Sequence, residues 1–177
     1  MTERPASYDS VSKWLHWTTA VLLVAGYFIG ENTSHRFADG VGYGIHVSIG
    51  IAILALTLAR IGWRLAFAAP AYPDTMSSLE KSAASLTKLA FYAILLLLPL
   101  SGLVTHGHEF PAGGQIFGLF ELPSLPGWLF LGEAEEVHEL ASHAWIPLAG
   151  LHAAAALWHH RFRRDGVLTR MLPGRNA

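Results

Sequence analysis

Four stretches of apolar residues dominate the hydropathy pattern, and polar or Pro/Gly-rich segments separate them. They cover about residues 10–30, 42–65, 85–106 and 135–161. Each is near the roughly 20 residues that an α-helix needs to cross about 30 Å of hydrocarbon. Pro99 and Pro147 fall inside two of the stretches, where neighbouring helices can satisfy the freed backbone groups. The pattern therefore predicts an all-α fold: an integral membrane four-helix bundle, with residues 1–177 as a single domain.

Composition supports a membrane protein and narrows its chemistry. Hydrophobic residues make up 52% of the 177 residues and charged residues 14%. These fractions lie outside the usual range for a soluble domain. The chain has no cysteine, so disulfides, iron–sulfur clusters and thiolate metal sites are excluded and any metal must bind histidine. The formal net charge of −1 gives no reason to expect nucleic acid as a partner.

The distribution of Lys and Arg predicts the orientation. In a four-span arrangement, eleven of the twelve cationic residues lie on one side and only Arg36 lies on the other. The eleven are Arg4, Lys13, Arg60, Arg64, Lys81, Lys88, Arg161, Arg163, Arg164, Arg170 and Arg175. Because cytoplasmic loops carry the excess of Lys and Arg, we expect both termini to be cytoplasmic in this multi-pass protein.

Histidines inside the predicted spans are the candidate functional residues, since ionisable side chains at membrane depth are costly and rare. His16 and His152 lie at similar depths near the inner side. His46 and His138 lie at similar depths near the outer side. His138 and His152 are fourteen residues apart, which on one helix gives a difference of about 40° in direction and roughly 21 Å in height. Two pairs at two depths suit two haems with bis-histidine ligation.

Other histidines have simpler explanations. One buried histidine can join two helices by hydrogen bonds, but four in depth-matched pairs favour a shared function. His143 lies about 140° away from the direction of His138 and His152, which indicates a packing role. His159 shares that direction, yet it abuts His160 and Arg161 at the interface, where snorkelling is an alternative explanation. A histidine-based metal transporter, or a structural anchor without haem, is the alternative of another class.

Several sequence segments resemble one known family. They are "SVSKWLHW" around His16, "YGIHVSIGI" around His46, "LLPLSGL", "VHELASHAWIPLAGLHAAAALWHHRF" and the closing "DGVLTRMLPGR". Together they resemble the bacterial cytochrome b561 family of small four-helix di-haem membrane proteins. The resemblance covers nearly the whole chain. It implies that one haem b binds to His16 and His152 and the other to His46 and His138, which is the pairing that depth predicts.

The resemblance also implies a function in the bacterial cytoplasmic (inner) membrane. Members of the family pass electrons between an outer-side donor and the quinone pool, and the small ones resemble a superoxide:ubiquinone oxidoreductase. On this basis His159, His160 and Arg161 are the candidate quinone site, and Arg36 with His35 is the candidate mouth for the donor. Membrane lipid and ubiquinone are then the expected partners.

Superoxide is the leading expectation for the donor, but the charge of the outer side weakens it. Eight acidic residues face Arg36 alone in the predicted outer connections: Glu31, Asp39, Glu109, Glu121, Glu133, Glu135, Glu136 and Glu139. An anion is steered by positive potential, whereas this surface is negative. The alternative function is therefore a membrane subunit that passes electrons between quinone and a periplasmic redox protein.

Overall fold

The computed structural model describes residues 6–36, 41–109, 115–119 and 133–174, without the side chains of residues 32–36 and 106–109. In this part of the chain there are four long α-helices: α1 (Ser10–Arg36), α2 (Val41–Ala66), α3 (Ser78–Glu109) and α4 (Ala134–Trp158). A π-helical turn, His159–Arg163, continues α4, and a 3-10 turn follows at Thr169–Met171. The all-α prediction is confirmed.

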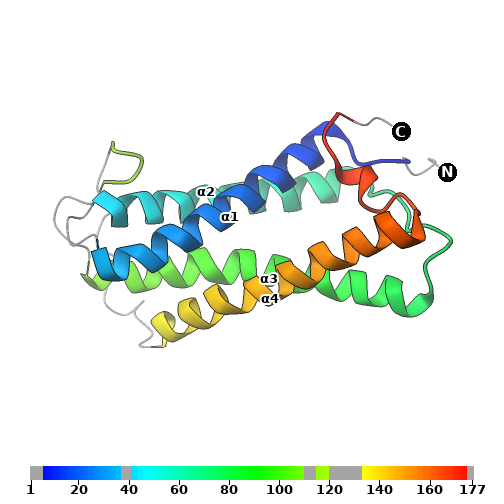
Figure 1. Cartoon of the computed structure of the whole chain (residues 1–177). Coiled ribbons are helices and arrows are strands. Elements are labelled where there is room, and N and C mark those ends of the chain that lie inside the picture. The colour runs from blue at the N-terminus through cyan, green and yellow to red at the C-terminus, as the bar shows by residue number, and fades with distance from the viewer. Residues whose placement is uncertain (1–5, 37–40, 110–114, 120–132, 175–177) are drawn as a thin grey trace.

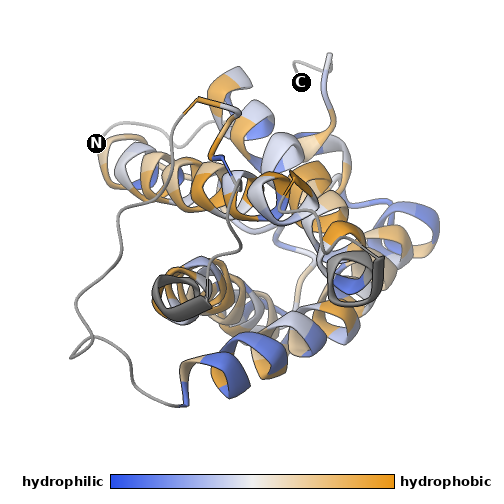
Figure 2. Cartoon of the chain, turned by 90° about the vertical axis from the view of Figure 1, so that its left-hand side faces the viewer, coloured by the Kyte–Doolittle hydropathy of each residue, from blue (hydrophilic) through white to orange (hydrophobic). Residues whose placement is uncertain are grey.

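The helices form an elongated bundle (Figures 1 and 2). Helix α1 packs on α2, α2 on α3, and α3 on α4. The two ends of the chain lie at the same end of the bundle (Figure 1), which we call the terminal end; the opposite end is the distal end. Successive helices are therefore antiparallel, and α4 runs from the distal to the terminal end.

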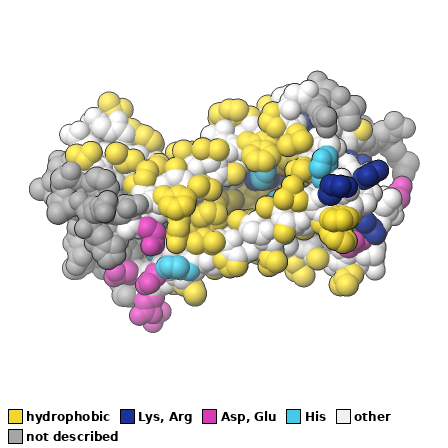
Figure 3. Space-filling model, viewed as in Figure 1, with side chains coloured by type: hydrophobic (Ala, Val, Ile, Leu, Met, Phe, Trp, Pro, Cys, Tyr) yellow, Lys and Arg dark blue, Asp and Glu magenta, His cyan; other side chains and the backbone are white. Residues whose placement is uncertain are grey.

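Length and composition make three of the described helical segments suitable for crossing a membrane. They are Val41–Ala66, Ser78–Thr105 and Ala134–Arg163. Helix α1 has 27 residues, but His16, Thr18 and Thr19 lower the hydropathy of its first half. Large apolar side chains remain exposed on the outside of the bundle (Figure 3), among them Val21, Leu58, Leu89 and Leu151. Such a surface fits a hydrocarbon solvent.

Local capping explains where two helices begin. The Asp9 carboxylate accepts hydrogen bonds from the backbone N–H of Ser12 at 2.9 Å and from its hydroxyl at 2.8 Å. In α3, Ser77 and Glu80 cap each other reciprocally. Both arrangements satisfy N–H groups that the first helical turn leaves unpaired. Because α3 begins at Ser78, it extends several residues beyond the predicted span toward the terminal end.

Leu23, Ile53, Leu95 and Trp145 form the buried apolar centre, with one residue from each helix. Leu23 lies between His16 and Gly30 in sequence, Ile53 follows His46 by two turns, and Trp145 lies midway between His138 and His152. The cluster is thus an apolar layer that separates the two levels of histidines.

After the π-helical turn, the chain folds back over the terminal end. The backbone of Arg164 adopts the left-handed conformation, with φ of 51°, and this reverses the direction of the chain. The carbonyl of Arg170 accepts from the N–H of Tyr8, and its guanidinium donates to the carbonyl of Ala71 at 2.7 Å. The indole of Trp17 donates to the carbonyl of Met171 at 2.9 Å. The closing segment thus holds α1 and the α2–α3 connection together.

Candidate functional site

The four predicted histidines meet in two pairs at two levels of the bundle. At the level nearer the terminal end, the rings of His16 on α1 and His152 on α4 have centroids 6.4 Å apart. At the distal level, the rings of His46 on α2 and His138 on α4 have centroids 6.0 Å apart. Helix α4 contributes to both levels. The structure therefore brings together the same pairs that depth along the sequence predicts.

The spacing within each pair fits two imidazoles on opposite sides of one metal ion. A metal–imidazole bond is roughly 2 Å long and the bonded nitrogen lies roughly 1 Å from its ring centroid, so the two centroids would be about 6 Å apart. Both observed separations agree with this value. The two planes cross at 74° in one pair and 76° in the other, so neither pair is a stacked contact.

Hydrogen bonds fix which nitrogen of each distal ring is free. Nδ1 of His46 bonds the carbonyl of Gly26 at 3.1 Å, and Nδ1 of His138 bonds the carbonyl of Leu98 at 2.8 Å. Since a carbonyl oxygen only accepts, Nδ1 carries the proton in both rings and Nε2 keeps its lone pair. Metal-binding histidines are oriented in this way by a backbone carbonyl.

Two glycines hold the distal rings in place by close approach. A Cβ atom on Gly30 would lie 2.8 Å from Cε1 of His46, and one on Gly102 would lie 2.9 Å from Cε1 of His138. No side chain larger than hydrogen fits at either position without moving the ring. Gly44, by contrast, lies against the backbone of Gln115, where Ser48 accepts the N–H of Phe117.

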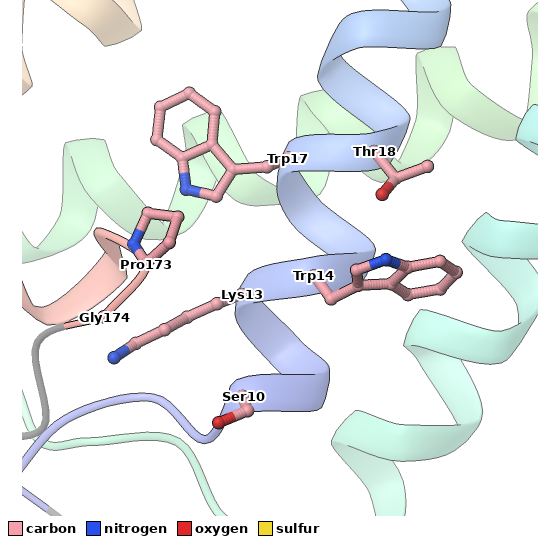
Figure 4. Close-up of a pocket in the computed structure, with 7 residues that line it drawn as sticks. All are labelled: Ser10, Lys13, Trp14, Trp17, Thr18, Pro173 and Gly174. Carbon is pink, nitrogen blue, oxygen red and sulfur yellow. The ribbon is translucent and has the colours of Figure 1, made fainter.

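Aromatic side chains surround the pair nearer the terminal end. Trp17 contacts His16 with centroids 5.2 Å apart, and Phe91 contacts His152 with centroids 5.3 Å apart. Trp17 also lines a groove of about 320 Å³ on the outer face of α1, together with Lys13, Trp14 and Pro173 (Figure 4). One side chain thus separates this groove from His16.

Each pair offers only two protein ligands. Among the described residues, no group of three or more His, Asp or Glu side chains is placed to hold a metal ion. A structural zinc site needs about four protein ligands. A metal held by either pair would therefore need further ligands from outside the described residues, and a haem would supply them if the two histidines of the pair bound its iron.

The candidate quinone residues divide into two environments. His159 begins the π-helical turn and is buried, and its Nδ1 lies 2.5 Å from Oδ2 of Asp165. Burial raises the pKa of Asp165, but hydrogen bonds from His159 and from the N–H of Val167 outweigh it and bring the pKa below its ordinary value. Asp165 is thus an ionised acceptor for His159. His160 and Arg161 are exposed.

The remaining predicted residues take no part in these pairs. His143 is exposed, its Nδ1 bonds the carbonyl of Glu139 at 2.9 Å within its own helix, and its ring contacts Tyr27. The candidate donor residues Arg36 and His35 fall where side chains are not described, and so do His106 and His108.

These observations define a helical membrane protein with two histidine pairs suited to haem, and comparison with known proteins names its family. The model for prokaryotic cytochrome b561 matches residues 7–174. Cytochrome b562 of Cereibacter sphaeroides is 35% identical over 181 residues, covering 97% of this chain and 98% of the relative. Cytochrome b561 homolog 2 of Escherichia coli K12 is 27% identical, covering 97% and 94%. The probable superoxide oxidase CybB of Yersinia pestis is 31% identical, covering 94% and 96%.

The chain therefore belongs to the prokaryotic cytochrome b561 family. It is a membrane electron-transfer protein, and the cofactor of its family is haem b. The resemblance seen in the sequence is confirmed.

Sequence reasoning missed three residues that shape the site. Gly30 and Gly102 make room for the distal rings, and Asp165 binds His159. The sequence does contain a signal for Gly102, because Ser101 and Gly102 interrupt an apolar span. None existed for Asp165, because its contact depends on the reversal at Arg164.

Proposed function

We propose that this protein is a four-span, di-haem electron-transfer protein of the bacterial inner membrane. It carries electrons from superoxide on the outer side to ubiquinone near the cytoplasmic side. Both termini are cytoplasmic, so the terminal end faces inward and the distal end outward. The single observation that carries the proposal is the presence of two histidine pairs at two levels of one bundle. The ring centroids are 6.4 Å apart in one pair and 6.0 Å apart in the other.

The protein supplies the ligands, their orientation and a dry interior. His46 and His138 would hold the outer haem through Nε2, with each Nδ1–H donated to a backbone carbonyl. His16 and His152 would hold the inner one. When bound, the two haems would supply one-electron redox couples that span the membrane. The apolar layer around Leu23 and Trp145 keeps water from the space between the two levels.

Superoxide is the preferred donor because a relative 31% identical over nearly the full length is a probable superoxide oxidase. Two superoxide anions lose one electron each and become two molecules of O₂. Ubiquinone takes the two electrons with two protons and becomes ubiquinol. Arg36 and His35 are the residues we propose for the donor mouth, since a local positive charge attracts the anion.

The quinone residues we propose are His159, His160 and Arg161 at the terminal end. Asp165 accepts a hydrogen bond from Nδ1–H of His159, which leaves Nε2 free to take up a proton from the cytoplasmic side and pass it to a quinone oxygen. His160 and Arg161 are exposed and available to a ring that arrives from the lipid. The groove beside Trp17 and Trp14 offers a second approach to the same end of the bundle.

The test is reduction by superoxide of purified, oxidised protein, followed by addition of ubiquinone. We expect superoxide to produce the reduced b-type spectrum, superoxide dismutase to abolish this, and ubiquinone to restore the oxidised spectrum. Oxidised haems that stay oxidised in the presence of superoxide would remove superoxide as the donor.

A second candidate donor is a basic periplasmic redox protein. Glu133, Glu135, Glu136 and Glu139 are exposed at the start of α4, and acidic side chains gather at the distal end (Figure 3). Such a surface suits a basic partner and speeds its association at low salt. Reduction by a basic c-type cytochrome that slows as salt rises would favour this function over superoxide.

A further inference from the structure

Arg60 lies at the level of the inner histidine pair. Helices α1 and α2 are antiparallel, and Arg64 donates to the Ser12 hydroxyl at 3.3 Å. One turn further from the terminal end, α2 reaches Arg60 and α1 reaches His16. Arg60 is therefore part of the surroundings of this pair.

The guanidinium of Arg60 has an aromatic contact in place of an acidic partner. It lies 5.7 Å from the ring centroid of Tyr92, the neighbour of Phe91, whose ring contacts His152. Neither ion pair seen among the described residues, His159–Asp165 or Arg163–Glu80, involves Arg60, and no described carboxylate pairs with it. Cations at membrane depth normally pair with an anion. This arrangement therefore indicates an anion that the protein itself does not provide.

Thr57 is a second, independent sign of such a ligand. It lies three residues before Arg60 on the same side of α2 and is 0% exposed. Its Oγ1 has no hydrogen-bond partner among the described residues. Buried helical Thr and Ser hydroxyls often donate to the carbonyl one turn earlier, as Thr19 does to Leu15 and Ser48 does to Gly44. The Thr57 hydroxyl therefore has a hydrogen-bonding capacity that the described residues do not use.

We propose that Arg60 and Thr57 hold a propionate carboxylate of the inner haem. This inference rests on the proposed di-haem function and adds two positioning residues to it. The guanidinium neutralises the carboxylate, and the Thr57 hydroxyl donates a hydrogen bond to it. Together they would hold the anionic edge of the cofactor beside α2 and place a positive charge next to it.

The proposal predicts a change in the reduction potential of the inner haem. Oxidised haem iron carries one more positive charge than reduced iron, so a nearby cation favours the reduced form. Arg60→Gln should lower the equilibrium constant for reduction about tenfold, which for a one-electron couple is a downward shift of about 59 mV. The outer haem should keep its potential. Thr57→Val, which has the same shape without the hydroxyl, should move the inner haem in the same direction by a smaller factor, about threefold.

The experiment is a spectroelectrochemical titration of the purified holoprotein, with haem per chain measured in parallel. Arg64→Gln is the matched control, because it removes an equal charge one turn nearer the terminal end and should leave both potentials unchanged. An Arg60→Gln protein with two haems and unchanged potentials would overturn the inference and leave the di-haem proposal intact. A wild-type protein without haem would overturn the proposed function itself.

Loss of the inner haem in Arg60→Gln would make Arg60→Lys decisive. If positive charge is the requirement, Arg60→Lys should keep two haems and lie closer to the wild-type potential than Arg60→Gln does. Loss of the inner haem from Arg60→Lys as well, with Arg64→Gln intact, would show a requirement for shape alone and would contradict a charge-based contact.

Discussion

Substitution of Gly102 by alanine tests the assignment of His138 without touching the ligand. A Cβ at this position would lie 2.9 Å from Cε1 and 3.0 Å from Nδ1 of His138. Ordinary van der Waals contact begins at 3.4 Å, so the ring has to retreat by about 0.5 Å. Nδ1 of His138 now lies 2.8 Å from the carbonyl oxygen of Leu98. A movement of that size away from Leu98 would lengthen the hydrogen bond to about 3.3 Å, beyond the usual range of about 2.7–3.2 Å.

The expected result is selective loss of the outer haem. Loss of the groups that orient a metal-bound histidine typically costs about 10- to 100-fold in metal affinity. When an excess of a haem-scavenging protein is added, Gly102→Ala should therefore lose about one haem per chain at a much higher rate than wild type does. The inner haem should be released at the wild-type rate.

The matched control is Gly62→Ala on α2. A Cβ there has nothing within 4 Å, and alanine is favoured over glycine in a helix by up to about 1 kcal/mol. Gly62→Ala should therefore keep both haems and be at least as stable as wild type. If Gly102→Ala releases haem no faster than Gly62→Ala, His138 is not positioned as we describe.

Three further substitutions have distinct outcomes. His143→Ala should retain both haems, because His143 is exposed and bonded within its own helix; loss of either haem would contradict the pairing. His159→Ala should keep both haems yet slow ubiquinone reduction about 100-fold, the lower end of what general acid–base groups contribute, and unchanged turnover would exclude the proton role. The pKa of Asp165 is lower in the folded protein than its ordinary value of 3.8. The ionised carboxylate therefore stabilises the fold at pH values above 3.8, and this stabilisation is lost as the pH falls through the lower pKa of the folded state. Thermal melts should therefore lose less stability on acidification in Asp165→Asn than in wild type, and equal losses would refute the contact.

The sequence was enough to predict the helices and the histidine pairs because both depend on regular geometry. Apolar stretches indicate helices, and fourteen residues on one helix bring His138 and His152 back to nearly the same direction. His16 and His46 then follow from depth alone, because a membrane bundle keeps residues of equal depth at one level.

The rest depends on contacts that periodicity does not report. Helix α3 begins earlier than hydropathy indicates because Ser77 and Glu80 cap a polar turn beyond the apolar span. Asp165 returns to His159 only because Arg164 reverses the chain in a left-handed conformation. From the sequence, Arg60 is one of the cationic residues of the predicted cytoplasmic side. Only its contact with Tyr92, without a described acidic partner, indicates another role.

The amount of haem in the purified protein tests the central claim most directly. A pyridine haemochrome spectrum identifies the haem type and gives its ratio to protein in one measurement. The two histidine pairs predict b-type haem at two per chain, falling to one in His138→Ala and in His152→Ala. One haem per chain in the wild type, two in either variant, or a colourless protein would contradict the account.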